Sequence, residues 1–185
     1  MRALRLLPAV LVLAGCPAAE QPPVVATDMS CFNNRVLSFQ DLVAEVVIPS
    51  GESCSGGTFQ VVFTRGGDTL ETLTEPRNGT VGFIGTADVD GDGRGEFFVS
   101  TIGIEGSSRG SLFAYSETTQ GIARFAMAPL DSAQMKDYAG HDRFGFGGGD
   151  QLVRAFPRTG ADTAWFGYSH GEKTWKTIAR PAWVR

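Results

Sequence analysis

The chain has 185 residues, with 16 lysines and arginines against 20 aspartates and glutamates, and a net charge of −4. The length fits one domain with a modest core. The acidic balance argues against nucleic acid as a partner and suits a basic protein. Residues 1–15 hold two arginines and no acidic residue, so the chain without them carries a net charge of −6.

A secretory signal is predicted over residues 1–15. Arg2 and Arg5 precede the apolar run "LLPAVLVLAG", which is too short to span a bilayer as a permanent helix. The run leads into "LAGC", which resembles the lipobox of bacterial lipoproteins, where the cysteine carries lipid. We therefore expect lipid on Cys16 and a membrane contact through that anchor only. The alternative is an ordinary signal peptide with an incidental cysteine.

The expected location is the cell envelope. Pro17 stands where the enteric inner-membrane retention signal has an aspartate, so a Gram-negative source would place the protein on the outer membrane, facing the periplasm. Residues 16–30 are rich in proline and small residues and predict an extended tether, followed by a single β-rich domain over residues 31–185.

Two cysteines remain after Cys16. Cys31 and Cys54 form an even pair in an exported and therefore oxidising compartment, and we predict a disulfide between them. Two free buried thiols are the alternative.

Most of the domain alternates apolar and polar residues at period two, with Gly, Asn and Asp between the runs, and this predicts β-strands. Asn78–Gly79 is predicted as a two-residue hairpin turn. The fold class expected is all-β, an antiparallel β-sandwich or open barrel with one short helix. The predicted strands are 42–49, 58–65, 69–75, 80–87, 96–104, 110–117, 121–128, 151–158 and 163–170.

An acidic loop lies between two of these strands, in "ADVDGDGRGEFFVS". Its spacing predicts oxygen ligands for calcium, because calcium takes six to eight oxygens. It is not an EF-hand, since position 12 holds valine. It resembles the calcium segments of FG-GAP-type bacterial repeats. The alternative is a solvated turn whose aspartates bind their own amides. The predicted ligands are Asp88, Asp90, Asp92, Glu96 and the carbonyl of Arg94.

Later segments give weaker signals. Residues 129–139 are predicted as the one helix, with Asp131 or Ser132 as its cap and Met135 and Tyr138 on one side. "GHDRF" at 140–144 is interpreted as a turn, in which Asp142 binds nearby amides and Arg143 pairs with an acid.

"GYSHG" at 167–171 matches the nucleophile elbow of serine hydrolases. No acid or histidine follows it in the order that fold needs, and the next residues suit the second strand of a hairpin. We therefore expect no catalytic residue and no enzyme activity, and Ser169 is left as a weak alternative nucleophile.

Several segments, taken in order, resemble the bacterial periplasmic inhibitors of invertebrate-type lysozyme. They are "GGTFQVVFTR", "EPRNGTV", "ADVDGDGRGEFFVS" and "GSSRGSLFAY", within about residues 42–117, and the later "YAGHDRFGFGGGDQLVRAFP" looks like the extension of longer lipoprotein members. The resemblance implies a β-sandwich that blocks a lysozyme with a Ser/Gly-rich loop. Many lysozymes are basic, which suits the acidic chain.

The inhibitory loop implied by the resemblance is "EGSSRGS", residues 105–111. Arg109 stands where the family has a tyrosine, so the loop offers a cation in place of an aromatic hydroxyl. Lysozyme chemistry uses two carboxyl groups, and an arginine pairs with a carboxylate through two hydrogen bonds. A solvated arginine is the alternative, and a calcium-stabilised, FG-GAP-like binding or adhesion lipoprotein is the alternative function. The candidate loop residues are Gly106, Ser107, Ser108, Arg109 and Gly110.

Overall fold

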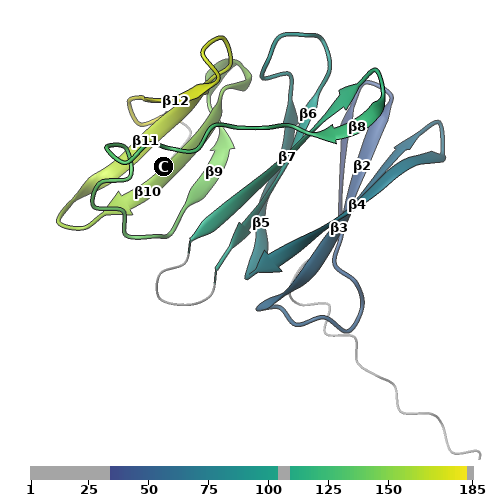
Figure 1. Cartoon of the computed structure of the whole chain (residues 1–185), viewed down its shortest axis with the longest axis horizontal. Coiled ribbons are helices and arrows are strands. Elements are labelled where there is room, and N and C mark those ends of the chain that lie inside the picture. Colours follow the sequence, from purple (N-terminus) through teal and green to yellow (C-terminus); the bar gives the residue numbers. More distant parts are fainter. Residues whose placement is uncertain (1–33, 104–108, 183–185) are drawn as a thin grey trace, which may run out of the picture.

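The computed structural model describes residues 34–103 and 109–182, which form three four-stranded antiparallel sheets (Figure 1). The predicted all-β fold is confirmed. The first sheet contains β1 (Arg35–Phe39), β2 (Leu42–Val47), β3 (Gly56–Arg65) and β4 (Asp68–Asn78). The second contains β5 (Thr80–Ala87), β6 (Glu96–Ile102), β7 (Gly110–Thr118) and β8 (Gly121–Arg124). The third contains β9 (Arg143–Phe146), β10 (Leu152–Arg158), β11 (Ala161–Ser169) and β12 (Thr174–Thr177), with a 3-10 turn at Gly148–Asp150.

The second sheet is buried on both of its faces. Successive residues of a strand point to opposite faces, and in β6 Phe97 and Val99 enter the core shared with the first sheet, whereas Phe98 enters the core shared with the third. Six of the seven β6 residues are buried as a result. The sandwich expected from the sequence therefore carries a third layer, which covers the outer face of its second sheet.

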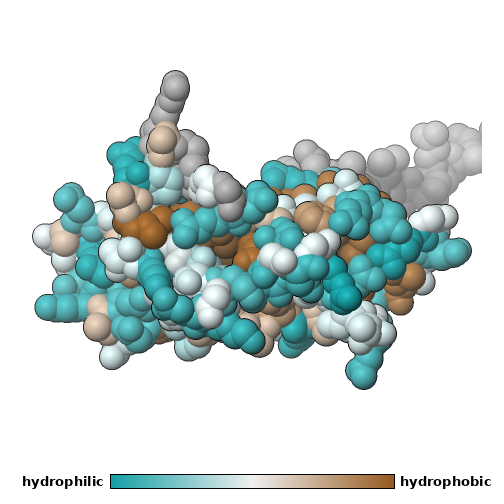
Figure 2. All heavy atoms as spheres, turned by 90° about the horizontal axis from the view of Figure 1, so that it is seen from above, coloured by the Kyte–Doolittle hydropathy of each residue, from teal (hydrophilic) through white to brown (hydrophobic). Residues whose placement is uncertain are grey.

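Aromatic side chains dominate both cores. Phe63 of the first sheet makes edge-on contacts with Phe97 at 5.4 Å and Tyr115 at 5.8 Å between ring centroids. In the other core, Phe156 and Phe166 of the third sheet stack at 5.4 Å. The surface seen in Figure 2 is mostly hydrophilic, with hydrophobic residues in smaller areas between. Burial of apolar area between the layers is the main stabilising term.

The predicted hairpin turn at Asn78–Gly79 is wrong. β4 and β5 belong to different sheets, so the chain crosses from the first layer to the second at Gly79. Gly79 has a φ of +116°, which favours glycine, and a Cβ there would lie 1.9 Å from the carbonyl oxygen of Ile102. The crossing therefore needs glycine both for its backbone angle and for the close approach of β6.

The helix predicted over 129–139 is also absent, and this part of the chain forms turns. Asp131 does accept from the Gln134 amide at 2.7 Å, as a cap would, and the Met135 amide donates to its carbonyl at 2.9 Å. These bonds form a turn that does not continue as a helix, because Asp137 takes a φ of +58° and the chain turns toward β10. Tyr138 then bridges to Arg158, so pairing with the third sheet overrides the local helical preference.

Two short strands, β1 and β9, escaped prediction, and "GHDRF" is not a free turn, because β9 begins at its Arg143. The predicted hairpin after residue 169 is confirmed, since β11 pairs with β12.

In the described ranges, no helical segment has the length and hydropathy that a membrane crossing requires. Residues 1–15, Cys16 and Cys31 lie outside those ranges, so the signal, the lipid and the Cys31–Cys54 disulfide stay predictions.

Candidate functional site

The candidate site is the end of the second sheet where β6 stops and β7 starts. Ile102 and Gly110 face each other as the last pair of these two strands, so they form the root of the loop between them. Gly106, Ser107 and Ser108 lie outside the described residues. Arg109 and Gly110 are described, and the start of β7 lies toward the lower side of Figure 1.

A buried carboxylate holds the β7 side of the root. The Gly110 amide donates to Asp142 Oδ2 at 2.8 Å, and Asp142 is 1% exposed. The same carboxylate accepts a hydrogen bond from the Tyr138 hydroxyl and an ion-paired one from Arg154 Nε at 2.7 Å. Because a buried charge is stable only when paired and hydrogen-bonded, these partners fix Asp142 beneath Gly110.

Two further observations show how tightly this side is built. A Cβ on Gly110 would lie 2.6 Å from the Asp142 Cβ, so glycine lets β7 approach the carboxylate. The Arg154 guanidinium also lies over the rings of Phe144 and Phe156, 5.6 Å from each centroid. The pKa of Tyr138 rises to about 12, first because its hydroxyl is buried and then because it donates to Asp142.

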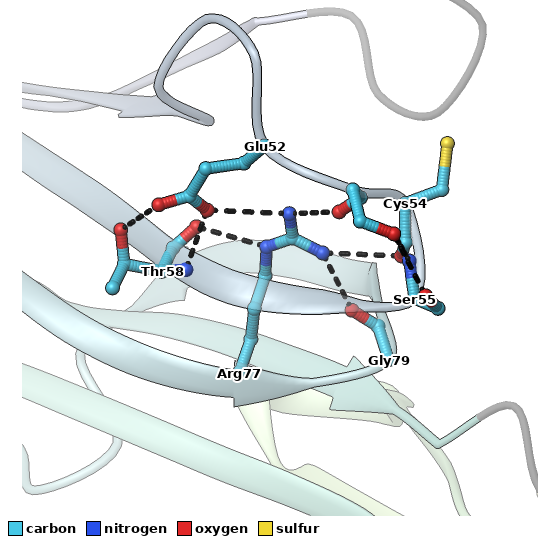
Figure 3. Close-up of polar contacts among 7 residues, drawn as sticks. Glu52, Cys54, Ser55, Thr58, Arg77 and Gly79 are labelled. Atoms are coloured by element: carbon cyan, nitrogen blue, oxygen red, sulfur yellow. Dashed lines mark hydrogen bonds and ion pairs between the residues drawn. The ribbon is translucent and has the colours of Figure 1, made fainter.

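A buried arginine holds the β6 side of the root through the crossing at Gly79. Arg77 of β4 is 4% exposed, and its guanidinium donates to the carbonyls of Gly79 and Thr58, each at 2.8 Å (Figure 3). It also donates to the carbonyl of Cys54 at 3.1 Å. Gly79 in turn packs against the Ile102 carbonyl. One guanidinium therefore joins β4, the β2–β3 connection and the root of the loop.

Glu52 completes this network from the β2–β3 connection. Its carboxylate accepts from the Thr58 hydroxyl at 2.7 Å and lies 3.4 Å from Arg77 Nη2 (Figure 3). The pKa of Glu52 is lowered, chiefly by the Thr58 hydroxyl and amide and to a smaller extent by Arg77. The connection before β3 is thus tied down by side-chain hydrogen bonds, although it has no strand of its own.

Arg109 remains exposed above this root. Its guanidinium carbon lies 5.9 Å from the ring centroid of Tyr138, a cation–π contact that orients the arginine without using its hydrogen-bond donors. The root of the loop therefore presents the Arg109 guanidinium beside the hydrogen-bonded network of Tyr138 and Asp142. A carboxylate is the group that such a guanidinium binds best.

The acidic loop lies at the opposite end of β6. The Asp88 carboxylate accepts from the amides of Gly91, Asp92 and Gly93, and Asp92 accepts from the Arg94 amide. These are the local bonds of the turn that the sequence offered as the alternative to calcium. Carboxylate oxygens of Asp88, Asp90 and Glu96 nevertheless lie within 4.8 Å of one another, while Asp92 is outside that group.

Glu96 anchors this loop to the second sheet. It is fully buried, and it accepts from the Val89 amide at 2.9 Å and the Ser116 hydroxyl at 3.0 Å. Burial, and to a lesser extent Asp90 and Asp92, raise its pKa to about 7. The donor set of Asp88, Asp90 and Glu96 is the all-oxygen kind that calcium prefers, so these residues fit the ion, and its binding stays a prediction.

The hydrolase-like motif has the wrong setting for an elbow. Ser169 is the last residue of β11 and pairs with Thr174 of β12, within an antiparallel sheet. An elbow needs a strand, a sharp turn and a helix.

Arg77, Tyr138 and Arg154 were missed as site residues, and Asp142 was assigned only local bonds. Asp142 does accept a hydrogen bond from a backbone amide, but from that of Gly110, 32 residues away in the chain, and it forms an ion pair with Arg154. Arg143, which was expected to pair with an acid, forms no ion pair with a described residue. The one signal available was a charged residue at an alternating, inward position of a strand, as for Arg154 in "LVRAF".

No protein-family model matches the chain, and no curated protein sequence matches it. Among solved structures, it is similar to PliI-Ah, the periplasmic lysozyme inhibitor of I-type lysozyme from Aeromonas hydrophila, at 22% identity and a TM-score of 0.47. That match covers 55% of this chain and 95% of the inhibitor. The A. hydrophila PliI complex with Meretrix lusoria lysozyme matches at 21% identity and a TM-score of 0.45, covering 55% and 91%. At these values the likeness is a distant one of fold.

Proposed function

We propose that the protein is a cell-envelope lipoprotein that binds and inhibits a lysozyme, with the invertebrate type favoured, by placing the loop at residues 105–111 in the active-site cleft. The observation that carries the proposal is the root of that loop. Both of its strands are fixed by buried charged networks, centred on Asp142 and Arg77, while Arg109 is left exposed next to the root.

A rigid root matters because a loop that enters a cleft must be ordered when it binds. Ordering costs free energy, and a root that is already fixed lowers that cost. Buried hydrogen-bonded carboxylates and guanidinium groups, together with the close approach of glycines at positions 79 and 110, serve this purpose here. The sequence resemblance covers these strands in the same order, from β3 to β7.

The exposed cation suits the proposed target. A glycoside hydrolase of this class uses a pair of carboxyl groups beside the scissile bond. Arg109 would pair with one of them, and Ser107 and Ser108 would replace hydroxyl contacts of the sugar. The acidic charge of the chain would favour encounter with a basic lysozyme, because complementary charge raises association rates.

The test is a peptidoglycan-lysis assay with the purified chain from residue 28 onward. The panel contains an invertebrate-type lysozyme, such as that of Meretrix lusoria, and chicken- and goose-type enzymes. We expect inhibition of the invertebrate type at micromolar protein or below. Full lysis by every enzyme in the presence of excess protein would rule the proposal out.

The lipid anchor has a separate test. Expression of the full chain in a Gram-negative host should give an outer-membrane protein. The mass of its N-terminal peptide should include a diacylglyceryl group on the sulfur of Cys16 and an acyl group on its amine. The Cys16→Ser variant should be released in soluble form. An unmodified cysteine would reduce the proposal to a secreted inhibitor.

The alternative is a calcium-stabilised binding lipoprotein unrelated to lysozyme. It is favoured by the proximity of the Asp88, Asp90 and Glu96 carboxylates. Calorimetry of one sample with calcium, and of another with the lysozyme panel, separates the two functions. Heat with calcium alone would favour the alternative, and heat with a lysozyme would favour inhibition.

A further inference from the structure

A hollow lies on the third sheet, away from the loop. Arg143, Ala155 and Trp165 are opposite one another on β9, β10 and β11, so their side chains form one row on one face of the sheet. Alternation places this face opposite to the one on which Phe156 and Phe166 enter the core. Because alanine is small and its neighbours are large, Ala155 is buried in the middle of the row, and the hollow lies beside the row.

The hollow has the size of a ligand site. Its volume is about 750 Å³, within the range of small-molecule pockets, and the row lines it together with His141, Thr163 and Arg180. A second hollow of about 290 Å³ shares the same row and extends to Ile102 and Asp142 at the loop root. Both hollows are lined by Arg143, Ala155 and Trp165, and the larger one is called the groove below.

The larger hollow has more basic than acidic residues in its lining, unlike the chain as a whole. Arg143 and Arg180 bring two positive charges, and Asp162 is the one acidic residue lining the larger hollow within the described part of the chain, in a protein of net charge −4. Arg143 is exposed, and it has no hydrogen bond or ion pair with any described residue. An arginine with unused donors beside a hollow is placed to bind a carboxylate.

The remaining lining residues indicate what carries that carboxylate. Trp165 is half-buried at the side of the row, and an indole offers a broad apolar surface with one donor. Thr163 and His141 offer polar groups at the rim. A sugar ring combines an apolar face with hydroxyl groups at its edge, and it matches this mixture better than an extended acidic peptide does.

We propose that this groove binds a carboxylate-bearing sugar, with Arg143 on the carboxylate and Trp165 against the ring. The site is distinct from the loop at 105–111, and its existence does not depend on lysozyme inhibition. A protein anchored in the cell envelope would meet such sugars in the glycan of the wall. The groove would then hold the protein at the polymer that a lysozyme attacks.

The test compares two disaccharides that differ chiefly by one carboxylate-bearing group. The first is N-acetylglucosamine linked to N-acetylmuramic acid, and the second is chitobiose, which lacks the lactyl carboxylate. Binding to the purified chain is followed by NMR and by tryptophan fluorescence. We expect the acidic disaccharide to bind with a Kd of about 1 mM or lower and chitobiose at least roughly tenfold more weakly.

Variants locate the site and keep it apart from the inhibitory loop. Arg143→Gln and Trp165→Leu should each weaken binding of the acidic disaccharide about tenfold or more, because each removes one of its two main contacts. Arg109→Gln should leave sugar binding unchanged while it weakens lysozyme inhibition, and Lys136→Gln, an exposed cation outside both sites, should change neither. Melting temperatures of all four variants check that they fold.

Three results would overturn the proposal. One is equal affinity for the two disaccharides, and another is no binding of either at about 10 mM. The third is tighter binding of tetraglutamate than of the acidic sugar, which would assign the groove to a peptide. Because inhibition is measured on the same variants, loss of the sugar site and loss of the proposed inhibitory function give different patterns.

Discussion

Two arginines of this protein differ in their exposure to solvent. Arg77 is enclosed and donates to several carbonyl groups, whereas Arg109 is exposed and lies over the ring of Tyr138. Burial decides between the two roles, because a guanidinium removed from water must satisfy its donors inside the protein. The two residues make separate predictions.

Arg77→Ala should strongly destabilise the fold. The change leaves buried carbonyls of Thr58 and Gly79 without a donor, and each buried group left unpaired costs roughly 1–3 kcal/mol. We expect the free energy of unfolding in urea to fall by about 3 kcal/mol or more. Lys136→Ala, at an exposed position, should stay within about 0.5 kcal/mol. Equal effects of the two substitutions would contradict the role given to the network.

Arg109→Gln should weaken inhibition without affecting stability. The arginine is exposed, and its guanidinium lies over the Tyr138 ring without a hydrogen bond to the Asp142 or Arg77 networks, so its removal should leave the root intact. If it pairs with a lysozyme carboxylate, the inhibition constant should rise about tenfold, which equals ~1.4 kcal/mol. An unchanged constant would mean that Arg109 is a solvated residue and that other parts of the loop make the contact.

At the level of elements, the crossing from β4 to β5 fixes how the first two sheets meet. Gly79→Ala places a methyl group 1.9 Å from the Ile102 carbonyl oxygen and forces alanine to a φ of +116°. Backbone strain and overpacking cost roughly 1–3 kcal/mol each, so we expect a loss of about 3 kcal/mol or more in urea unfolding.

Gly66→Ala is the matched control for this crossing. Gly66 lies in the turn between β3 and β4, also at positive φ, but with no atom near its missing Cβ. It should cost about 1 kcal/mol, the ordinary penalty of a left-handed residue. A loss at Gly79 no larger than that at Gly66 would show that the approach to β6 is not needed.

The acidic loop gives a prediction about metal. If Asp88, Asp90 and Glu96 bind calcium, the melting temperature should rise with added calcium and fall again with chelator. Calcium at one hundred times its Kd should raise the free energy of unfolding by ~2.7 kcal/mol. Glu96→Gln and Asp88→Asn should abolish the rise. The same melting temperature with calcium and with chelator would leave the loop as a turn closed by its own amide bonds.

This loop and the proposed inhibitory loop adjoin the two ends of β6 in the chain. If calcium stiffens one end, it should also affect what the other end binds. Lysozyme inhibition measured with calcium and with chelator tests that coupling, and equal inhibition under both conditions would show that the two ends are independent.

At the level of the whole molecule, the third sheet is required to cover the second. Phe98 and Ala114 point into the core that β10 and β11 complete. A chain that ends at residue 128 would expose this apolar face, so it should aggregate or bind a hydrophobic dye, although the first sandwich core is intact. A soluble, monomeric and cooperatively folding fragment would show that the third layer is an optional addition.

The sequence by itself determined the all-β class, most strand positions and the two loops at the ends of β6. Period-two alternation is a local property, because neighbouring residues of a strand always point to opposite faces. The same pattern even held a signal of the third layer. The run "FFV" at 97–99 in β6 places apolar residues on both faces, which indicates a strand covered on both sides.

Only the tertiary structure decided which surfaces meet. Alternation shows that Phe97 and Phe98 face opposite ways, but not that a third sheet covers Phe98. The crossing at Gly79, the turn in place of the helix at 129–139 and the bond from Gly110 to Asp142 all depend on contacts between distant segments. The row of Arg143, Ala155 and Trp165 depends on strand register in the same way, since pairing partners are chosen by the packed fold.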